Sequence, residues 1–423
     1  MSAATDGPAV GGPGAAALPD RPRLTILYHF FHPDDVVSSE LFSGLAADLA
    51  ARGWDVEAVT SNRLCHADGS AGPPRQTWQD VRIRRVWRPG LRQASGKGRI
   101  LNALWMIGAW SLIAFRRPRR LPQVLFIGTD PVLSLLTAAV VKTLRPEVKI
   151  VHWAYDLYPE AAVADGLLQP QSGPVRLLQR LLRRAYGSCD LVADLGSCMR
   201  ERLEAYGHKC RKITLPPWAL AEPPAVATAD PELRQRLFGP ARLTLLYSGN
   251  FGRAHEYAEF LALARQLRDT GIVLGFAVRG NRAAELTAAV TPEDTNVRFL
   301  PFVPESELAQ HLAAADVHLV SLRQHWTGIV VPSKFFGSLA SGRPVLFAGE
   351  ASSCLARWIA DYDLGWRLDM ARVPAVAADL LRLADTPADL RRRQQHCFDV
   401  YHAHFSRTRV VTAFDQELRA LLR

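Results

Sequence analysis

An alternation of apolar runs and amphipathic segments, which occurs twice, restricts the fold of this chain more than any other feature. From residue 24, apolar runs such as RLTILYHFF are followed by helical patterns such as SSELFSGLAADLAARG, where Gly53 ends the helix. Near-continuous apolar strands joined by helical crossovers are typical of parallel sheets covered on both faces. The sequence therefore predicts an α/β fold of two doubly wound domains that face each other across a cleft.

A proline-rich stretch, PPWALAEPPAVATADPE at 216–232, interrupts this alternation and reads as an interdomain linker. The N-terminus is rich in Ala, Gly and Pro and lacks the basic start and apolar core of a signal peptide, so we expect it to be disordered. The predicted units are a leader (1–23), an N-terminal domain (24–217), a linker (218–232), a C-terminal domain (233–404) and a final helix (405–423) that packs back on the N-terminal domain.

The net charge of the 423-residue chain is +10, which favours an anionic partner: a phosphorylated substrate, nucleic acid or an acidic membrane face. Nucleic acid is disfavoured because the arginines flank an apolar segment and do not alternate with aromatic residues. The six cysteines form no CxxC motif, and no pair of histidines completes a zinc pattern. We therefore expect no metal, and reduced thiols of a cytoplasmic protein.

Residues 100–115, ILNALWMIGAWSLIAF, are an almost unbroken apolar run. The run is shorter than the roughly 20 residues that cross a bilayer. We expect a helix in the membrane interface, with Trp105 and Trp110 at headgroup depth, although a buried core helix is the alternative. The arginines expected to meet anionic lipid are Arg116, Arg117, Arg119 and Arg120. The prediction is peripheral association with the inner face of the plasma membrane, through a membrane-associating segment at residues 100–120.

Ligands of doubly wound sheets bind beyond the carboxyl ends of the strands. One such end in the second half reads YSGNFGRAHE (247–256), where Gly249 and Gly252 permit close approach of the backbone and Arg253 offers charge for a phosphate. It is neither a P-loop nor GxGxxG, so an ordinary turn remains an alternative. Another strand end, RGN (279–281), either borders a nucleobase or is a plain turn.

The segment GIVVPSKFFGSLASGRPVLFAG (328–349) places a second anion site at the start of a helix. We expect Ser333 to cap a helix from Lys334 to Ser341, whose first amides and lysine attract a diphosphate. Gly337 lies inside this helix, where a glycine costs about 1 kcal/mol relative to alanine.

Strand ends in the first half carry GTDP (128–131) and HWAYDLYPE (152–160). They place Asp130, His152, Asp156 and Glu160 where the hydroxyl of an acceptor would lie. We predict catalytic roles for the first three, while a packing role is the alternative for the histidine.

Taken in order, DLYPEAAVADGLL, YSGNFGRAHE, NVRFLPFVPESEL, AAADVHLVSL and VPSKFFGSLASGRPVLFAG resemble family-four retaining glycosyltransferases of the GT-B fold, which has two Rossmann-like domains. The closest branch builds bacterial surface polysaccharides of the colanic-acid and capsule type. The resemblance covers residues 24–423 and implies a hexosyltransferase that needs neither metal nor cofactor. It also implies that the N-terminal domain is acceptor-binding and the C-terminal domain sugar-nucleotide-binding. The implied donor-binding residues are Gly249, Asn250, Gly252, Arg253, Arg279, Gly280, Gly328, Ser333 and Lys334.

Two departures from the family accompany this resemblance. In HPDDVVSSE (32–40), Ser38 and Ser39 replace the glycines of the first loop, and with Glu160 they are the expected acceptor-binding residues. The paired glutamates of many relatives fall on Ile329 and Gly337, so both acids are absent. Gly337 either leaves room for the nucleotide or marks a loosened site.

The leading interpretation is a retaining glycosyltransferase that transfers a sugar from a nucleotide-sugar to a polyprenyl-diphosphate-linked glycan in exopolysaccharide or capsule biosynthesis. The leaving diphosphate then accepts the proton of the acceptor, so positive charge matters more than a protein base. A non-catalytic nucleotide-binding scaffold of an assembly complex and a sugar-nucleotide 2-epimerase remain the alternatives.

Overall fold

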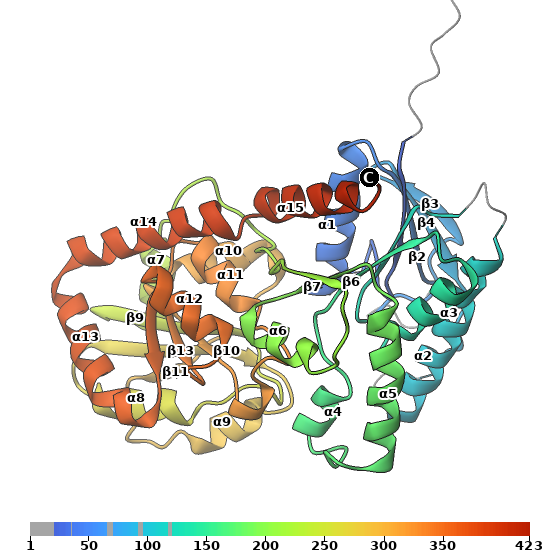
Figure 1. Cartoon of the computed structure of the whole chain (residues 1–423). Helices are drawn as coiled ribbons and strands as arrows, with labels where there is room; N and C mark the ends of the chain where they lie inside the picture. Colours follow the sequence, from blue (N-terminus) through green and yellow to red (C-terminus); the bar gives the residue numbers. More distant parts are fainter. Residues whose placement is uncertain (1–20, 35, 66–70, 92–95, 117–120) are drawn as a thin grey trace, which may run out of the picture.

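Two parallel β-sheets, one in each half of the chain, organise the structure (Figure 1). The computed structural model describes residues 21–423 except 35, 66–70, 92–95 and 117–120. The strand order of the first sheet is β3-β4-β2-β1-β5-β6-β7-β8, and that of the second is β11-β10-β9-β12-β13-β14. The prediction of two doubly wound α/β domains is confirmed.

The first half contains β1 (Arg23–Leu27), α1 (Val37–Ala51), β2 (Asp55–Ser61), β3 (Arg75–Trp78), β4 (Val81–Val86), α2 (Gly96–Ser111), the short helix η1 (Leu112–Phe115), β5 (Val124–Ile127), α3 (Leu136–Leu144), β6 (Lys149–Trp153), α4 (Glu160–Ala164), α5 (Gly173–Gly187), β7 (Leu191–Asp194), α6 (Ser197–Glu204) and β8 (Arg211–Thr214). Strand β3 pairs antiparallel with β4 at the sheet edge, and the other pairings are parallel. The sequence pattern did not predict β3, because its alternating side chains are all at least partly exposed.

The second half contains α7 (Pro231–Phe238), β9 (Leu243–Asn250), α8 (Ala258–Gln266), β10 (Ile272–Arg279), α9 (Ala283–Ala289), β11 (Val297–Phe299), α10 (Glu305–Ala313), β12 (Val317–Ser321), η3 (Gln324–Trp326), α11 (Lys334–Ala340), β13 (Val345–Ala348), α12 (Cys354–Tyr362), β14 (Gly365–Leu368), η4 (Met370–Arg372), α13 (Val373–Asp385), α14 (Pro387–His404) and α15 (Arg407–Ala420). All of its strand pairings are parallel.

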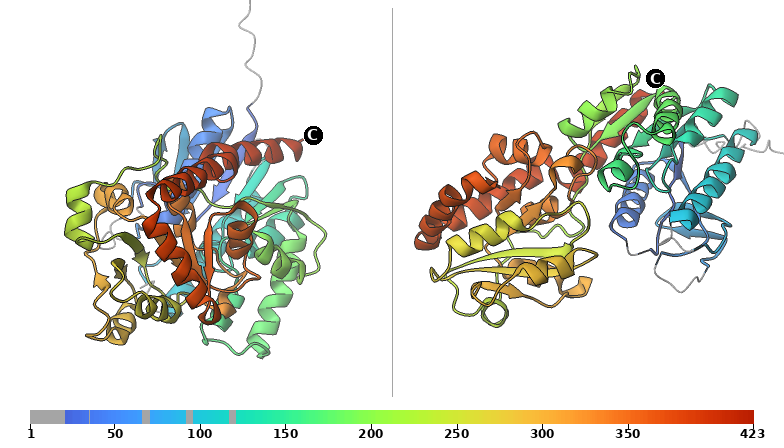
Figure 2. Two further views of the ribbon diagram at one scale, coloured as in Figure 1. Left: turned by 90° about the vertical axis from the view of Figure 1, so that its left-hand side faces the viewer. Right: turned by 90° about the horizontal axis from the view of Figure 1, so that it is seen from below.

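The last two helices return the chain from the second half to the first (Figure 2). Helix α15 packs against α1, where Arg407 Nε donates to Asp48 Oδ2 at 2.7 Å. The Phe414 ring of α15 is fully buried and lies edge-on to the Trp153 ring, with the two ring centroids 4.8 Å apart. The C-terminal segment therefore completes the core of the N-terminal half.

Between β8 and α7 the chain forms no helix or strand over residues 215–230, where the linker is predicted, and the fold begins within the expected leader. Residues 1–20 of the expected leader lie outside the described residues, but Pro22 already belongs to the fold, since its carbonyl accepts a hydrogen bond from the Asp55 amide at 2.9 Å. At the start of the expected linker, Trp218 is buried and stacks on Trp153. At its end, Asp230 caps α7. The ends of the linker are ordered because their side chains find partners.

Helix α2 continues into η1, and Gly96–Phe115 is long and apolar enough to cross a membrane, although core helices meet the same criterion. Within it Trp110 is buried, which corrects the expectation that it lies at headgroup depth, while Trp105 is 48% exposed. Arg116 does not face outward for lipid, because its guanidinium donates two hydrogen bonds to Glu57. The other three arginines of this prediction lie outside the described residues.

The SGRP motif between α11 and β13 contains Arg343, whose side chain has a structural role. Its buried guanidinium donates to four backbone carbonyls at 2.6–2.9 Å: those of Ala227, Ala313, Ala315 and Ser341. The first of these belongs to the connection between the halves. A single side chain thus holds that connection against the second domain.

We expect Arg343→Met to lower the free energy of unfolding by about 3 kcal/mol, because buried carbonyls would lose their donors. Arg392→Met is the matched control, since that side chain is 76% exposed and surface pairs contribute about 0–1 kcal/mol. Denaturant titration of both variants measures the difference. Equal stability of the two variants would contradict this role of Arg343.

Candidate functional site

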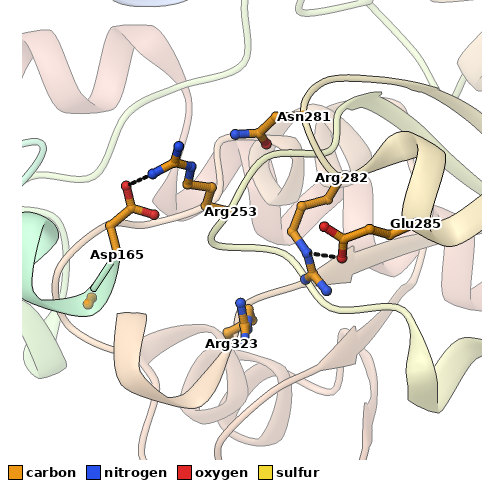
Figure 3. A pocket seen from close by; sticks show the side chains of 7 residues that line it. Asp165, Arg253, Asn281, Arg282, Glu285 and Arg323 are labelled. Atoms are coloured by element: carbon orange, nitrogen blue, oxygen red, sulfur yellow. Dashed lines mark hydrogen bonds and ion pairs between the residues drawn. The ribbon is translucent and has the colours of Figure 1, made fainter. Parts of the chain in front are cut away.

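A cationic pocket of about 530 Å³ lies between the two halves (Figure 3). The residues lining it are Ala164 and Asp165 from the N-terminal half and Arg253, Asn281, Arg282, Glu285 and Arg323 from the C-terminal half. Arg253 forms an ion pair with Asp165 across the pocket. Three guanidinium groups at the carboxyl ends of parallel strands form a site suited to phosphate.

The two loops that follow β9 and β10 are joined by backbone hydrogen bonds. The amide of Phe251 donates to the Arg279 carbonyl at 2.6 Å, and the amide of Arg282 donates to the Phe251 carbonyl at 3.2 Å. Gly280 has φ +127°, and a Cβ there would lie 2.5 Å from Asn250 Oδ1. Glycine is needed at this position so that the loops can meet.

Lys334 from α11 reaches the same loops. Its Nζ donates to the Asn250 carbonyl at 3.0 Å and lies 5.2 Å from the centroid of the Tyr247 ring. A Cβ on Gly249, which has φ +120°, would lie 2.9 Å from the Lys334 Cε. Burial lowers the pKa of the lysine to about 8. A diphosphate beside this ammonium would favour its charged form.

Seven of the nine predicted donor residues therefore gather around these loops: Gly249, Asn250, Gly252, Arg253, Arg279, Gly280 and Lys334. The guanidinium of Arg279 lies 4.1 Å from the centroid of the Phe302 ring. Ser333 precedes α11, but its side chain makes no capping hydrogen bond, which corrects the predicted cap. Gly328 lies against α6 of the N-terminal half, where a Cβ would meet the Cys198 carbonyl.

The sequence analysis missed Arg282 and Arg323. Both follow strand ends within a few residues, and that position is the signal that could have identified them. Glu256 lies between the two guanidinium groups, 3.9 Å from that of Arg282 and 3.7 Å from that of Arg323. This carboxylate holds both side chains near the pocket.

A second pocket, of about 270 Å³, lies at the strand ends of the N-terminal half. The residues lining it are Tyr28, Phe30, Ser38, Arg99, Thr129, Asp130, Val132, Tyr155, Asp156 and Tyr158. Aromatic faces and carboxylates together suit a sugar, because they offer apolar stacking and strong hydrogen-bond acceptors. Two predicted catalytic residues, Asp130 and Asp156, and one predicted acceptor residue, Ser38, meet here.

The two carboxylates of this pocket differ in environment. Loss of hydration at the pocket wall, with a contribution from the neighbouring Asp130, raises the pKa of Asp156 to about 6. Asp130 Oδ1 lies 3.3 Å from His29 Nδ1, and this histidine is buried. Sequence reasoning missed His29, although it follows β1 directly.

Three predicted residues of the N-terminal half lie away from this pocket, and the structure corrects each. His152 is buried in the core, and its Nδ1 lies 2.9 Å from the Ile127 carbonyl. Ser39 belongs to α1 and is fully buried. Glu160 accepts a hydrogen bond from the Tyr206 hydroxyl at 2.6 Å. None of these three side chains lines the pocket.

The positions of the two missing glutamates have different surroundings. Ile329 is buried, and its carbonyl accepts a hydrogen bond from the Leu157 amide at 3.1 Å across the halves. A Cβ on Gly337 would meet nothing within 4 Å. The space for a side chain at Gly337 is therefore open, whereas Ile329 serves the contact between the halves.

Solved structures define the class of this fold. A sucrose-phosphate synthase from Thermosynechococcus elongatus superposes with a TM-score of 0.69 at 16% identity, covering 95% of this chain and 99% of that one. The Anabaena protein HepE, solved in complex with UDP, has a TM-score of 0.60 at 10% identity, covering 95% and 99% of the two chains. The fold is that of the GT-B glycosyltransferases.

Sequence matches point in the same direction. Residues 40–218 match the family described as Glycosyl transferase 4-like domain. The Pseudomonas aeruginosa protein described as "Probable glycosyltransferase WbjE" is 26% identical over 303 residues, which are 70% of this chain and 74% of that protein. These matches support a glycosyltransferase of the GT-B type.

We expect Gly249→Ala to weaken nucleotide binding about tenfold, because its Cβ would displace Lys334 from the loop. Gly337→Ala adds the same atom into open space, so it should keep the affinity and stabilise α11 by about 1 kcal/mol. The nucleotide that best protects the wild type against unfolding is first identified. Calorimetric titration with this nucleotide then compares the affinities of the two variants. An equal loss of affinity in both variants would refute the close fit at Gly249.

The lowered pKa of Lys334 predicts a pH dependence of donor affinity. The lysine is mostly charged at pH 7 and mostly neutral at pH 9, while a bound diphosphate raises its pKa. The dissociation constant for a nucleotide-sugar, whose diphosphate stays ionised over this range, should rise about tenfold from pH 7 to pH 9. Lys334→Arg keeps its charge and should show little change, whereas an unchanged profile in the wild type would contradict the assignment.

Proposed function

We propose that this protein is a retaining glycosyltransferase that transfers a hexose from a nucleotide-sugar to a lipid-linked glycan during bacterial surface-polysaccharide biosynthesis. The observation that carries the proposal is the pairing of two pockets at strand ends: a cationic one between the halves and an aromatic, carboxylate-bearing one in the N-terminal half. The first suits a diphosphate, and the second suits the hydroxyls of a sugar.

Charge stabilisation is the main catalytic contribution in this proposal. Arg253, Arg282 and Lys334 stabilise the negative charge that develops on the leaving diphosphate. The diphosphate oxygen accepts the proton of the attacking hydroxyl as the new bond forms on the same face of the sugar, which retains the configuration. Asp130 and Asp156 orient the acceptor by accepting hydrogen bonds from its hydroxyls. The protein's own cations then serve the role that a divalent metal has in other transferases.

The role in surface polysaccharides rests on the resemblance of the motifs DLYPEAAVADGLL and VPSKFFGSLASGRPVLFAG to that branch of the family. The proposal of a polyprenyl-diphosphate acceptor rests on the N-terminal half, which contains both the second pocket and a large exposed apolar surface.

We propose that this half binds the inner face of the plasma membrane through α2, η1, α3 and α5. Helix α3 packs against both α2 and α5. The large apolar side chains exposed on these elements are Ile100, Leu101, Leu104, Trp105, Leu112, Phe115, Val140, Leu144, Leu177 and Leu181. Helix α5 adds the exposed arginines Arg176, Arg180, Arg183 and Arg184. A surface that combines apolar and cationic groups fits an anionic bilayer.

Activity is tested by incubating the purified protein with UDP-, GDP- and ADP-sugars, membranes that contain polyprenyl-diphosphate-linked glycan, and EDTA. We expect nucleotide release with one donor, unaffected by EDTA, and a product of the same anomeric configuration. No release with any donor would reject the transferase, and an inverted product would reject the retaining mechanism. Nucleotide protection without turnover would favour the scaffold, and isomerised donor without acceptor would favour the epimerase.

Membrane binding is tested by Leu104→Asp combined with Leu112→Asp. We expect at least tenfold weaker binding to vesicles that contain phosphatidylglycerol, because each leucine contributes about 1.5–3 kcal/mol when buried. The control combines Leu220→Asp with Met370→Asp, two exposed apolar positions outside this surface. Flotation of all three proteins with vesicles measures the effect, and equal binding by both double variants would contradict the proposed surface.

A further inference from the structure

Helix α6 of the N-terminal half contacts the second half at two points. At the first, Arg202 Nε donates to the Thr327 carbonyl at 2.6 Å, and a Cβ on Gly328 would lie 2.4 Å from the Cys198 carbonyl. At the second, Cys198 meets Cys354, the first residue of α12. The fold thus brings together two thiols that are 156 positions apart in the chain, one from each half.

The contact between these two cysteines is close. The amide of Cys354 donates to the Cys198 sulfur at 3.2 Å, and a hydrogen bond also joins the two thiols. A Cβ on Gly196, two residues before Cys198, would lie 2.8 Å from the Cys354 sulfur, so glycine there permits the close approach of α12 to α6. Thiols in such contact have only a short distance to close before a disulfide can form.

The surroundings favour the thiolate of Cys198. The hydrogen bond from the Cys354 thiol and the amides at the start of α12 and α6 lower the pKa of Cys198, whereas the same thiol contact and burial raise the pKa of Cys354. Arg357 of α12 adds positive charge, although it also pairs with Glu201. Its guanidinium donates to Ser197 Oγ at 2.8 Å. A cysteine at a helix N-terminus beside an arginine is typical of a reactive thiolate.

Both cysteines are buried, with exposed fractions of 5% and 2%, but they lie just beneath the surface. Ser197, directly before Cys198, is exposed, and so is Ser352, two residues before Cys354. Local opening of the contact therefore gives a small peroxide access to the sulfurs. Burial also hinders a bulky thiol such as glutathione, which favours a disulfide between the two cysteines over a mixed adduct.

We propose that Cys198 and Cys354 form a reversible disulfide in the presence of peroxide and that this bond locks the two halves together. The Cys198 thiolate attacks one oxygen of hydrogen peroxide, which breaks the O–O bond and gives a sulfenic acid and, after protonation, water. The Cys354 sulfur then displaces the hydroxyl group, loses its proton and closes the S–S bond. Two thiols and one peroxide thus give one disulfide and two waters, and a dithiol reductant reverses the change.

The bond would restrain the cationic pocket, because the residues that line this pocket come from both halves. The cross-linked helix α6 also contacts residues 327 and 328, a few positions before α11 and Lys334. Reversible oxidation therefore holds the pocket in one arrangement. The disulfide forms whether or not the protein is a transferase, so its test needs neither donor nor acceptor.

The bond itself is tested by mass spectrometry of the full chain after treatment with hydrogen peroxide. We expect a loss of about 2 Da, the mass of two hydrogen atoms, and a linked pair of peptides that contain Cys198 and Cys354, both reversed by dithiothreitol. Cys198→Ser and Cys354→Ser should abolish the link, whereas Cys210→Ser, which removes a half-buried thiol, should keep it. A link confined to Cys189 and Cys210, oxidation that stops at the sulfenic acid, or no loss of mass would overturn the proposal.

The locking is tested by hydrogen exchange in the same proteins. The Leu157 amide donates to the Ile329 carbonyl across the halves, so it exchanges when this contact opens. We expect exchange in the peptide that contains Leu157 to slow by about fivefold or more in the oxidised wild type, and to recover with dithiothreitol. Peroxide-treated Cys354→Ser should keep the rate of its untreated form. A disulfide that leaves this exchange unchanged would refute the lock.

Discussion

The carboxyl ends of parallel strands meet at one edge of each sheet, and the candidate site depends on this constraint. In the second half it brings the loops after β9 and β10 together, joined by the hydrogen bond from the Phe251 amide to the Arg279 carbonyl. In the first half it places Asp130 and Asp156 in one pocket. Side chains far apart in the sequence thus line common pockets at the sheet edges.

Contacts between the halves set the position of one pocket relative to the other. The Leu157 amide donates to the Ile329 carbonyl at 3.1 Å, and Arg202 Nε donates to the Thr327 carbonyl at 2.6 Å. Helix α15 adds the interaction with α1 on the far side of the molecule (Figure 1). Ile329 is buried at this contact.

Sequence reasoning was most successful where a pattern repeats locally. Most strands and helices of both halves and the glycine-bearing loop after β9 could be identified because periodicity and turn chemistry act over a few residues. It was wrong for His152 and Ser39, because strand β6 and helix α1 are buried on nearly all sides and give no sign of which residues face a pocket. Tertiary packing alone turned both side chains inward.

The sequence by itself determined two doubly wound sheets, their order along the chain and the loops at their carboxyl ends, since these follow from short-range hydrophobic periodicity. Only the tertiary structure decided which charges come together. Arg116 pairs with Glu57, 59 positions away, whereas Arg253, Arg282 and Arg323 lie together at the cationic pocket. The physical reason is that an ion pair or a pocket depends on distances in space, and residues remote along the chain set those distances.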